Sequence, residues 1–388
     1  MSELYGRRPP LLLGVLGMCF FQIGVATAQN LYTIMICRFF GGLFGSSPLA
    51  VVAGAFADFW DPVERGSALG IFSVMTFAGP VLAPVCGGFI NQSYLGWRWT
   101  EWITVIFGFA TFFLGLLTLP ETYTPLVLQA NAKRLRIETK NWALHATADE
   151  TEITMKVIVE KYLLRPFIMI WQEPILVLVT LYMGLVYGIL YLFFEAFPIS
   201  FTEVRHWNQG LSALPFLSIF IGVILGGGYI GYWSKTSYLP KFRAGGGRVV
   251  PEERLAPMIV GGVAITIGMF WWGWSSFPGV HKLWVSQLLA GIPIGAGILI
   301  IFVQGLSYIV DCYKWVANSA IAASTFFRSL LGAGFPLFAT GMYHNLGVPW
   351  ATSLLAFLCL ALIPVPFLFK VYGKRIRDKS RFVPDVGF

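Results

Sequence analysis

Long, almost uncharged runs of apolar residues recur along the whole 388-residue chain. A helix that crosses a bilayer needs about 20 such residues, and its backbone must satisfy its own hydrogen bonds in lipid. The sequence therefore predicts an all-α integral membrane protein, a helical bundle with ten transmembrane helices. The ten runs lie at residues 11–28, 31–56, 66–90, 99–119, 174–197, 210–232, 256–275, 283–309, 317–341 and 349–370.

Composition supports the lipid bilayer as the main partner of this surface. Only 12% of the residues are charged, against about 25% in a typical soluble domain. The net charge of +8 does not indicate a nucleic-acid partner, because the basic residues lie in loops between apolar runs. Neither a metal-ligand cluster nor a phosphate-binding loop is recognisable, so we expect no catalytic residues, no metal, no cofactor and no enzymatic activity.

Basic residues orient the spans, since loops rich in Lys and Arg stay on the cytoplasmic side. If residues 1–10 are cytoplasmic, the inner segments carry 22 of the 27 basic residues, and the outer segments carry only Arg98, Arg205 and Lys282. The remaining two lie inside spans. We expect a multi-pass protein of the plasma membrane with both termini in the cytoplasm.

The longest polar segment divides the spans unequally. Residues 120–173 separate a four-span bundle at 1–119 from a six-span bundle at 174–388 that includes a cytoplasmic tail. Secondary transporters are often built from two similar halves. The 4 + 6 arrangement therefore suggests that the first bundle is truncated and lacks two spans at its front.

Two arginines lie inside apolar runs. Arg38 is about two turns from the outer end of the second run, and Arg328 is near the middle of the ninth. A charge at such a depth costs about 2.5–3.5 kcal/mol on insertion scales, so it is seldom without a role. Arg38 could instead extend outward to the interface or hold helix ends together. Arg328 requires a buried partner or a water-filled cavity.

The third run combines helix-breaking residues. Gly79, Pro80, Pro84, Gly87 and Gly88 lie within ten positions of one another. The prolines each remove a backbone hydrogen bond and the glycines allow close helix contact, which favours a kinked, tightly packed gate. The alternative is ordinary packing, because both residue types are frequent in membrane helices.

A stripe of adaptable side chains marks the fifth run. Met183, Tyr187, Tyr191 and Glu195 recur at every fourth position and so share one helix face. Methionine and tyrosine suit an amphipathic ligand, and a terminal carboxylate would attract a cation. The same pattern also fits a packed helix that ends in an interfacial glutamate.

Six short stretches occur in one order along the chain. The first contains Glu3, Gly6, Arg7 and Arg8, and the others lie at 38–42, 79–88, 120–123, 308–313 and 325–329. In this order they resemble the signature motifs of the major facilitator superfamily, most closely those of fungal drug:proton antiporters of the twelve-span type. Met1 falls inside the first signature, so the resemblance implies that the first two spans of that family are absent.

The resemblance also implies a function. It suggests proton-coupled export of drugs, polyamines or similar small organic compounds by alternating access, with protons and a small-molecule substrate as partners. In this reading Arg38 assists proton coupling, and the segment from Gly79 to Gly88 is the antiporter motif. Two alternatives stay open: an uptake transporter for another solute, such as a sugar or an organic acid, and a non-transporting fragment.

Overall fold

A computed structural model describes residues 6–60, 62–146, 164–244, 250–277, 284–313, 316–378 and 380. All regular elements among these residues are helical, which confirms the expected all-α class. Eight of the helical stretches are long and apolar enough to cross a membrane. The predicted count of ten is therefore not confirmed, and the difference has two local causes.

The first cause is a break in the second apolar run. It forms α2 (Leu31–Gly45) and α3 (Ser47–Phe59), and each is shorter than a span requires. Asn30 caps α2 by accepting a hydrogen bond from the Thr33 backbone nitrogen at 2.8 Å. The second helix begins with a proline in its first turn, where the missing N–H would have no intrahelical partner.

The second cause is a long helix that joins two predicted spans. The last two runs lie in α15 (Ala317–Leu362), which continues into α16 (Pro364–Arg377). Inside α15, Gly347 has φ 74° and ψ 158°, a conformation that only glycine adopts readily. The kink at this residue divides α15 into two segments.

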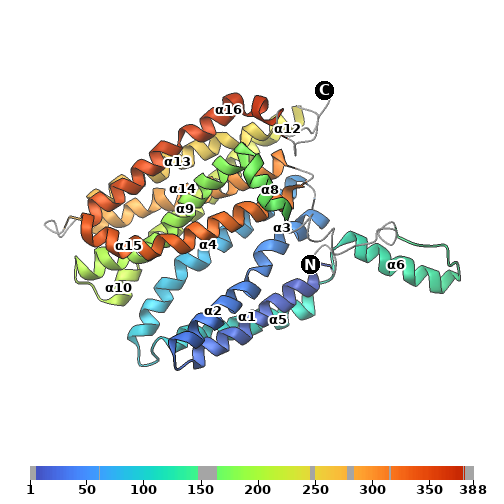
Figure 1. The fold of residues 1–388 in the computed structure, drawn as a ribbon, viewed down its shortest axis with the longest axis horizontal. Coiled ribbons are helices and arrows are strands. Elements are labelled where there is room, and N and C mark those ends of the chain that lie inside the picture. Colours follow the sequence, from blue (N-terminus) through green and yellow to red (C-terminus); the bar gives the residue numbers. More distant parts are fainter. Residues whose placement is uncertain are drawn as a thin grey trace. The chain divides into compact units, whose positions relative to one another are not determined.

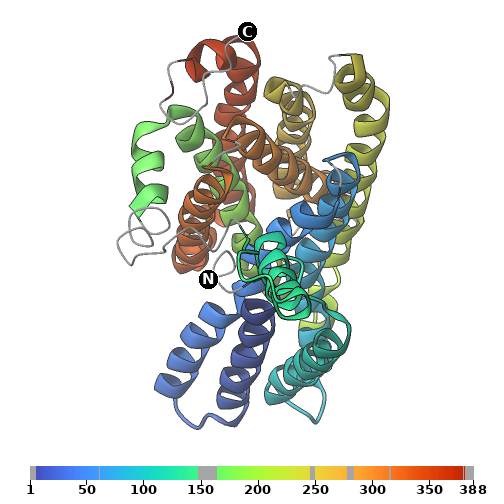
Figure 2. The ribbon, with the colours of Figure 1, turned by 90° about the vertical axis from the view of Figure 1, so that its right-hand side faces the viewer.

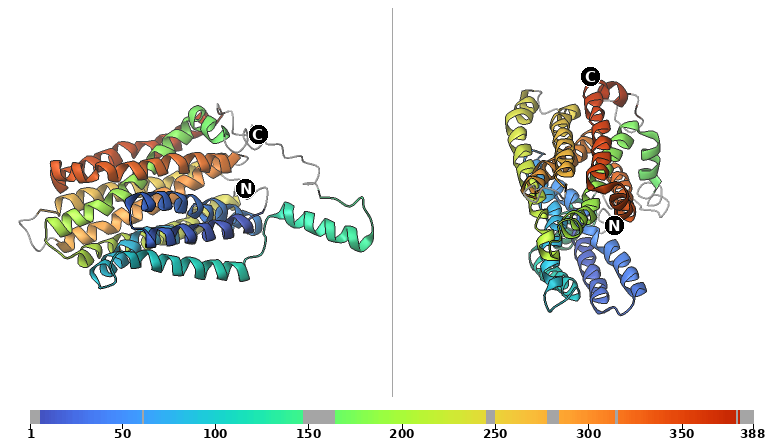
Figure 3. Two further views of the ribbon diagram at one scale, coloured as in Figure 1. Left: turned by 60° about the horizontal axis from the view of Figure 1, so that its bottom comes forward. Right: turned by 90° about the vertical axis from the view of Figure 1, so that its left-hand side faces the viewer.

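The chain forms two compact units, and α4 (Pro62–Gln92) contributes to both. Unit 1 comprises residues 1–69 and 90–155. Within it, α1 (Arg8–Thr27) packs against α2 and against α5 (Arg98–Thr118), as Figure 2 shows. The helix α6 (Thr124–Thr139) has no buried residues and extends apart from the other helices of unit 1 in Figure 3. It lies in the polar segment 120–173 that separates the two predicted bundles.

Unit 2 comprises residues 70–89 and 156–388. Its centre is α9, which packs along α15, while α14 packs against both α13 and α11 (Figure 1). The helices of this unit are α8 (Arg165–Gln172), α9 (Pro174–Phe197), α10 (Gln209–Ala213), α11 (Phe216–Trp233), α12 (Leu239–Ala244), α13 (Leu255–Trp274), α14 (Trp284–Cys312), α15 and α16.

Glycines bring these helices close together. A Cβ on Gly222 of α11 would collide with the backbone of Ile292 in α14, and one on Gly226 would lie 2.9 Å from the Ala296 carbonyl oxygen. The sixth apolar run, residues 210–232, thus packs closely at these two positions. At Gly228 a Cβ would meet open space among the described residues, so no close approach requires glycine at that position.

Candidate functional site

Arg328 lies inside unit 2 with its side chain against two aromatic rings. Its guanidinium carbon is 4.5 Å from the ring centre of Phe302 on α14 and 5.0 Å from that of Tyr187 on α9. The residue is 9% exposed, and its Nε has no hydrogen-bond partner. Among the described residues no carboxylate forms an ion pair with it. The aromatic faces are thus its only described partners.

Tyr187 and Tyr191 form a hydroxyl pair beside this arginine. Their hydroxyl oxygens are 3.1 Å apart, and their ring centres are 4.9 Å apart. Gly332 of α15 makes room for them, because a Cβ there would lie 2.9 Å from Tyr187 Cε1. The structure therefore brings together three of the predicted site residues: Arg328, Tyr187 and Tyr191.

A narrow crevice continues from this group into the apolar interior of unit 2. It is too tight in this conformation to admit a water molecule. Phe77 of α4 stands edge-on to Phe302, with ring centres 4.8 Å apart. The crevice is lined by Phe77, Met183, Val186, Tyr187, Ile298, Ile301 and Phe302.

Glu195, the last member of the stripe, is half-buried in α9. Eight positions separate it from Tyr187, about 12 Å along a helix. Its carboxylate has no hydrogen-bond or ion-pair partner among the described residues. Nothing in the structure tests the proposed attraction of a cation, which stays a prediction.

Arg38 has a buried acidic partner that the sequence analysis did not identify. Its guanidinium lies 2.5 Å from Glu101 Oε1, which joins α2 to α5 inside unit 1. The Arg38 side chain is exposed, whereas Glu101 is 6% exposed. Gln22 of α1 also donates to Glu101. The missed signal was a carboxylate within a predicted span, the same criterion that had singled out the arginine.

The first signature surrounds a second carboxylate. Glu121 accepts hydrogen bonds from the backbone nitrogens of Arg7 at 2.7 Å and Arg8 at 3.1 Å. Burial opposes the charged form, but these bonds and those from the Tyr123 and Thr122 backbone outweigh it and lower the pKa of Glu121.

Two further contacts complete this cluster. The Arg7 side chain donates to Asp58 Oδ2 at 2.9 Å and lies 5.0 Å from the Tyr123 ring centre. Gly6 has φ 89°, and a Cβ there would lie 2.6 Å from Glu121 Cδ. Glu3 lies outside the described residues. The cluster holds the start of α1 against the end of α3 and the segment after α5.

The positions of the glycine- and proline-rich segment differ in how closely they pack against other helices. The helix α4 continues through Pro80 and Pro84 without interruption. Gly88 lies close to α10, because a Cβ there would be 3.1 Å from the Gln209 carbonyl oxygen. At Gly79 a Cβ would meet open space, and Gly87 is half-buried. Close packing is thus described only at Gly88, and the role of a gate stays a prediction.

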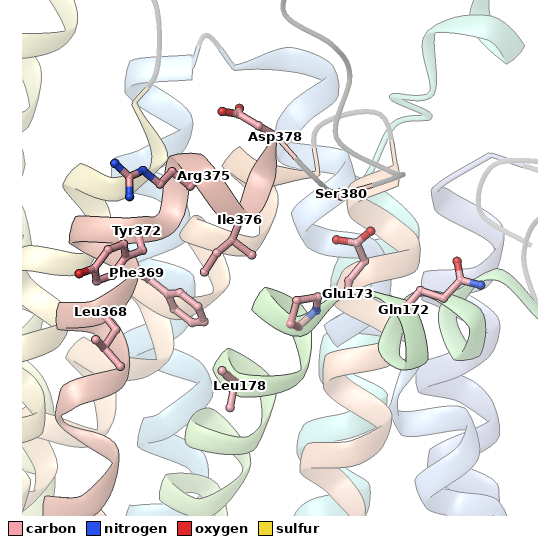
Figure 4. Close-up of a pocket in the computed structure, with 11 residues that line it drawn as sticks. Gln172, Glu173, Leu178, Leu368, Phe369, Tyr372, Arg375, Ile376, Asp378 and Ser380 are labelled. Carbon is pink, nitrogen blue, oxygen red and sulfur yellow. The ribbon is translucent and has the colours of Figure 1, made fainter.

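A larger pocket of about 1120 Å³ opens at the ends of α9 and α16 (Figure 4). Its most buried charged residue is Glu173, which accepts a hydrogen bond from the Tyr313 hydroxyl at 3.0 Å. The walls are mostly apolar and include Leu178, Leu368 and Phe369. No predicted site residue lines this pocket, and Glu173 is 14 positions, about 20 Å of helix, from Tyr187.

Asp311 at the end of α14 is paired. Its Oδ2 accepts a hydrogen bond from Arg254 Nε at 3.1 Å, and Arg254 also lies 3.9 Å from the Tyr238 ring centre. Among the described residues no group of three His, Cys, Asp or Glu side chains is placed to hold a metal ion.

Comparisons with known proteins agree with a bundle of membrane-spanning helices. Residues 1–336 match the sequence profile of the Major Facilitator Superfamily. The "Citrinin biosynthesis cluster MFS transporter mrr1" of Monascus ruber is 54% identical over 387 residues, which cover 99% of this chain and 76% of that protein. The "Ascochitine biosynthesis cluster MFS transporter" of Didymella fabae is 51% identical over 385 residues, which cover 99% and 74%.

A solved structure has a similar fold. The xylose transporter XylE from E. coli, in a partially occluded inward-open conformation, superposes with a TM-score of 0.64. The two chains are 18% identical, and the match covers 95% of this chain and 81% of that one. At this identity the likeness concerns the fold alone.

Proposed function

Because the chain belongs to the Major Facilitator Superfamily, we propose that it exports small organic compounds from the cell in exchange for protons. Transport rather than enzymatic chemistry follows from the family itself. Export, the coupling ion and the drug-antiporter subtype are the proposed part. So are the plasma-membrane location and the cytoplasmic termini.

The observation that carries the direction of transport is the naming of the relatives. Two proteins at least 51% identical to this chain are named as transporters of biosynthesis clusters. A cluster that makes a small organic compound has a use for a protein that removes it from the cell. The resemblance of several motifs to fungal drug:proton antiporters supports the same direction.

The Arg38–Glu101 pair is the proposed coupling element. A carboxylate held by a cation stays charged, and it takes up a proton more readily once the cation withdraws. Glu101 is buried, whereas Arg38 is exposed and attached to a different helix. A movement of α2 against α5 would therefore exchange the ion pair for a protonated acid, which links conformation to proton binding.

The test is dye accumulation in a yeast strain without its own major efflux pumps. Fluorescein, Nile red and rhodamine represent an anionic, a neutral and a cationic compound. We expect cells that contain the protein to retain less of at least one dye than cells with an empty vector. A protonophore should abolish the difference. Higher retention would favour the uptake alternative, and equal retention at verified expression would contradict transport of these dyes.

Glu101→Gln tests the coupling residue. It keeps the size of the side chain and one hydrogen-bond acceptor but cannot exchange a proton. We expect export that no longer responds to external pH. Glu138→Gln is the matched control, because Glu138 lies exposed on α6 in an i,i+4 pair with Arg134. If Glu101→Gln retained the pH response of the unmodified protein, the pair would be structural.

A further inference from the structure

The site around Arg328 contains donors and almost no acceptors. The guanidinium carries five N–H donors, yet no hydrogen-bond acceptor is described for any of them. Two aromatic faces stabilise a cation, but they do not accept the directed hydrogen bonds that the N–H groups supply. A buried arginine with no acceptor is a costly arrangement unless another molecule provides one.

The tyrosine pair adds one more donor. Tyr187 and Tyr191 have two hydroxyl hydrogens, and the single bond between their oxygens uses only one of them. No other partner of either hydroxyl is described. Either hydroxyl can be the donor of that bond, so the second hydrogen is available on the other tyrosine of the pair, and the Arg328 guanidinium carbon lies 5.0 Å from the Tyr187 ring centre.

We propose that this group binds the carboxylate of a small organic acid, whose apolar body contacts the aromatic wall formed by Phe302 and Phe77. The inference rests on the proposed export function and names its substrate class. A carboxylate is planar and matches the fork of a guanidinium with two parallel hydrogen bonds. The phenolic hydrogen supplies a third bond to the same group.

The apolar surroundings of Arg328 also favour a ligand with an apolar body. Phe302 contacts both Arg328 and Phe77, and Met183 and Val186 line the crevice behind it. Because the crevice excludes even water in this conformation, side chains must separate to admit a ligand. An aromatic or aliphatic acid would fill the space so formed, whereas a cation would be repelled by Arg328.

The experiment uses the full chain purified in detergent micelles and three probes with the same naphthalene body. Naphthoate carries the carboxylate, naphthamide is its neutral counterpart, and naphthylmethylammonium is cationic. Equilibrium dialysis measures binding through naphthalene fluorescence. We expect naphthoate to bind the unmodified protein most tightly and the cation least. A preference for the cation would overturn the proposal.

Variants connect the preference to the site. Arg328→Gln should weaken naphthoate binding by about tenfold or more, the loss of a charge-assisted pair, and should change naphthamide binding by less than about threefold. Arg328→Lys keeps the charge but not the fork, so an intermediate loss is expected. Tyr187→Phe removes a hydroxyl donor and keeps the ring. It tests the site if the arginine variants do not fold. Unchanged naphthoate binding in Tyr187→Phe and a folded Arg328 variant would refute the assignment.

An anion competition separates an organic acid from any small anion. The assay is run in methanesulfonate and repeated with chloride. If chloride displaces naphthoate as well as unlabelled organic acid does, the site is a general anion site and the proposal fails. Charge-selective binding that depends on Arg328, with no dye export in cells, would retain the site and contradict the proposed export of these dyes. Dye export in cells, without a binding preference for the carboxylate probe, would support the export function and refute the carboxylate site.

Discussion

The backbone nitrogen of Arg7 donates to Glu121 Oε1 at 2.7 Å and so joins residues 114 positions apart in the chain. The carboxylate at this point accepts four backbone hydrogen bonds, from Arg7, Arg8, Thr122 and Tyr123. A carboxylate bonded in this way fastens the start of α1 to the segment after α5. The negative charge of Glu121 contributes to this stabilisation, because ionised acceptors form stronger hydrogen bonds than neutral ones.

Glu121→Gln should lower the stability of the protein. The amide keeps one acceptor oxygen but turns two N–H donors toward a ring of donors. We expect a loss of about 1–2 kcal/mol, since Glu121 is only half-buried. The measurement is the thermal unfolding midpoint in detergent, with Glu138→Gln as the exposed control. Equal midpoints for the two variants would contradict the role.

The contribution of Glu121 should also depend on pH. Because the folded state lowers the pKa of this carboxyl, the stabilisation is complete above the unfolded value of about 4 and is lost as the pH falls through the folded value. The difference between the unmodified protein and Glu121→Gln should therefore be full at neutral pH and shrink in acid. A constant difference down to pH 3 would show that the charge is not involved.

Arg328→Met should raise the stability of the protein without ligand. The change removes a buried cation that has no described acceptor, and it retains an apolar side chain of similar length. Lost contact with Tyr187 and Phe302 offsets part of the gain, so about 1–2 kcal/mol is expected. Unfolding midpoints measure it, with Arg134→Met on exposed α6 as control. A lower midpoint would mean that Arg328 holds the fold together and has no need of a ligand.

Gly222→Ala should destabilise unit 2. The new Cβ would collide with the Ile292 carbonyl and lie 2.9 Å from the Ala296 backbone nitrogen, and neither atom can move without shifting α14. Overpacking of this kind costs about 1–3 kcal/mol. Gly228→Ala on the same helix is the matched control, because its Cβ would meet open space. Unfolding midpoints compare the two, and similar losses would refute the close crossing.

Much of the fold could be predicted from the sequence, because the alternation of apolar runs and polar loops reflects the thickness of a bilayer. The span boundaries could not. The mostly apolar stretch of 26 residues at 31–56 looks continuous, yet the chain breaks it after Gly45. Gly347 turns the chain inside what is otherwise helix. Both outcomes depend on backbone torsions that composition does not determine.

The candidate site was predictable in its members but not in its assembly. A charge inside a span singled out Arg328. The spacing of four residues predicted that Tyr187 and Tyr191 share one helix face, one turn apart. Phe302 lies on another helix, and nothing in its local sequence indicates a contact with an arginine. The charge criterion could also have singled out Glu101, but its pairing with Arg38 appears only once α2 and α5 are adjacent.

Residue 140 should face the cytoplasm. The split of basic residues between the two sides of the membrane motivates this prediction. Lys140 ends the exposed helix α6, so a cysteine there would be accessible to a reagent. Lys140→Cys is made together with Cys86→Ser, because Cys86 is itself exposed. An impermeant maleimide should label the variant only after the cells are opened, and labelling of intact cells would reverse the topology.

Glu195 and Arg328 should impose opposite charge preferences along α9. Glu195 has a half-buried carboxylate without a described partner, about 12 Å along the helix from Tyr187. Glu195→Gln keeps the size of the side chain and removes the charge. We expect naphthylmethylammonium binding to weaken by about fivefold, the value of an exposed ion contact of about 1 kcal/mol. Naphthoate binding should not weaken, because the repulsive charge has gone. Equilibrium dialysis at two pH values gives both affinities, with Glu138→Gln as the matched control. If the cationic probe binds Glu195→Gln as it binds the unmodified protein, the glutamate is an interfacial residue and the face that it shares with Met183 serves packing.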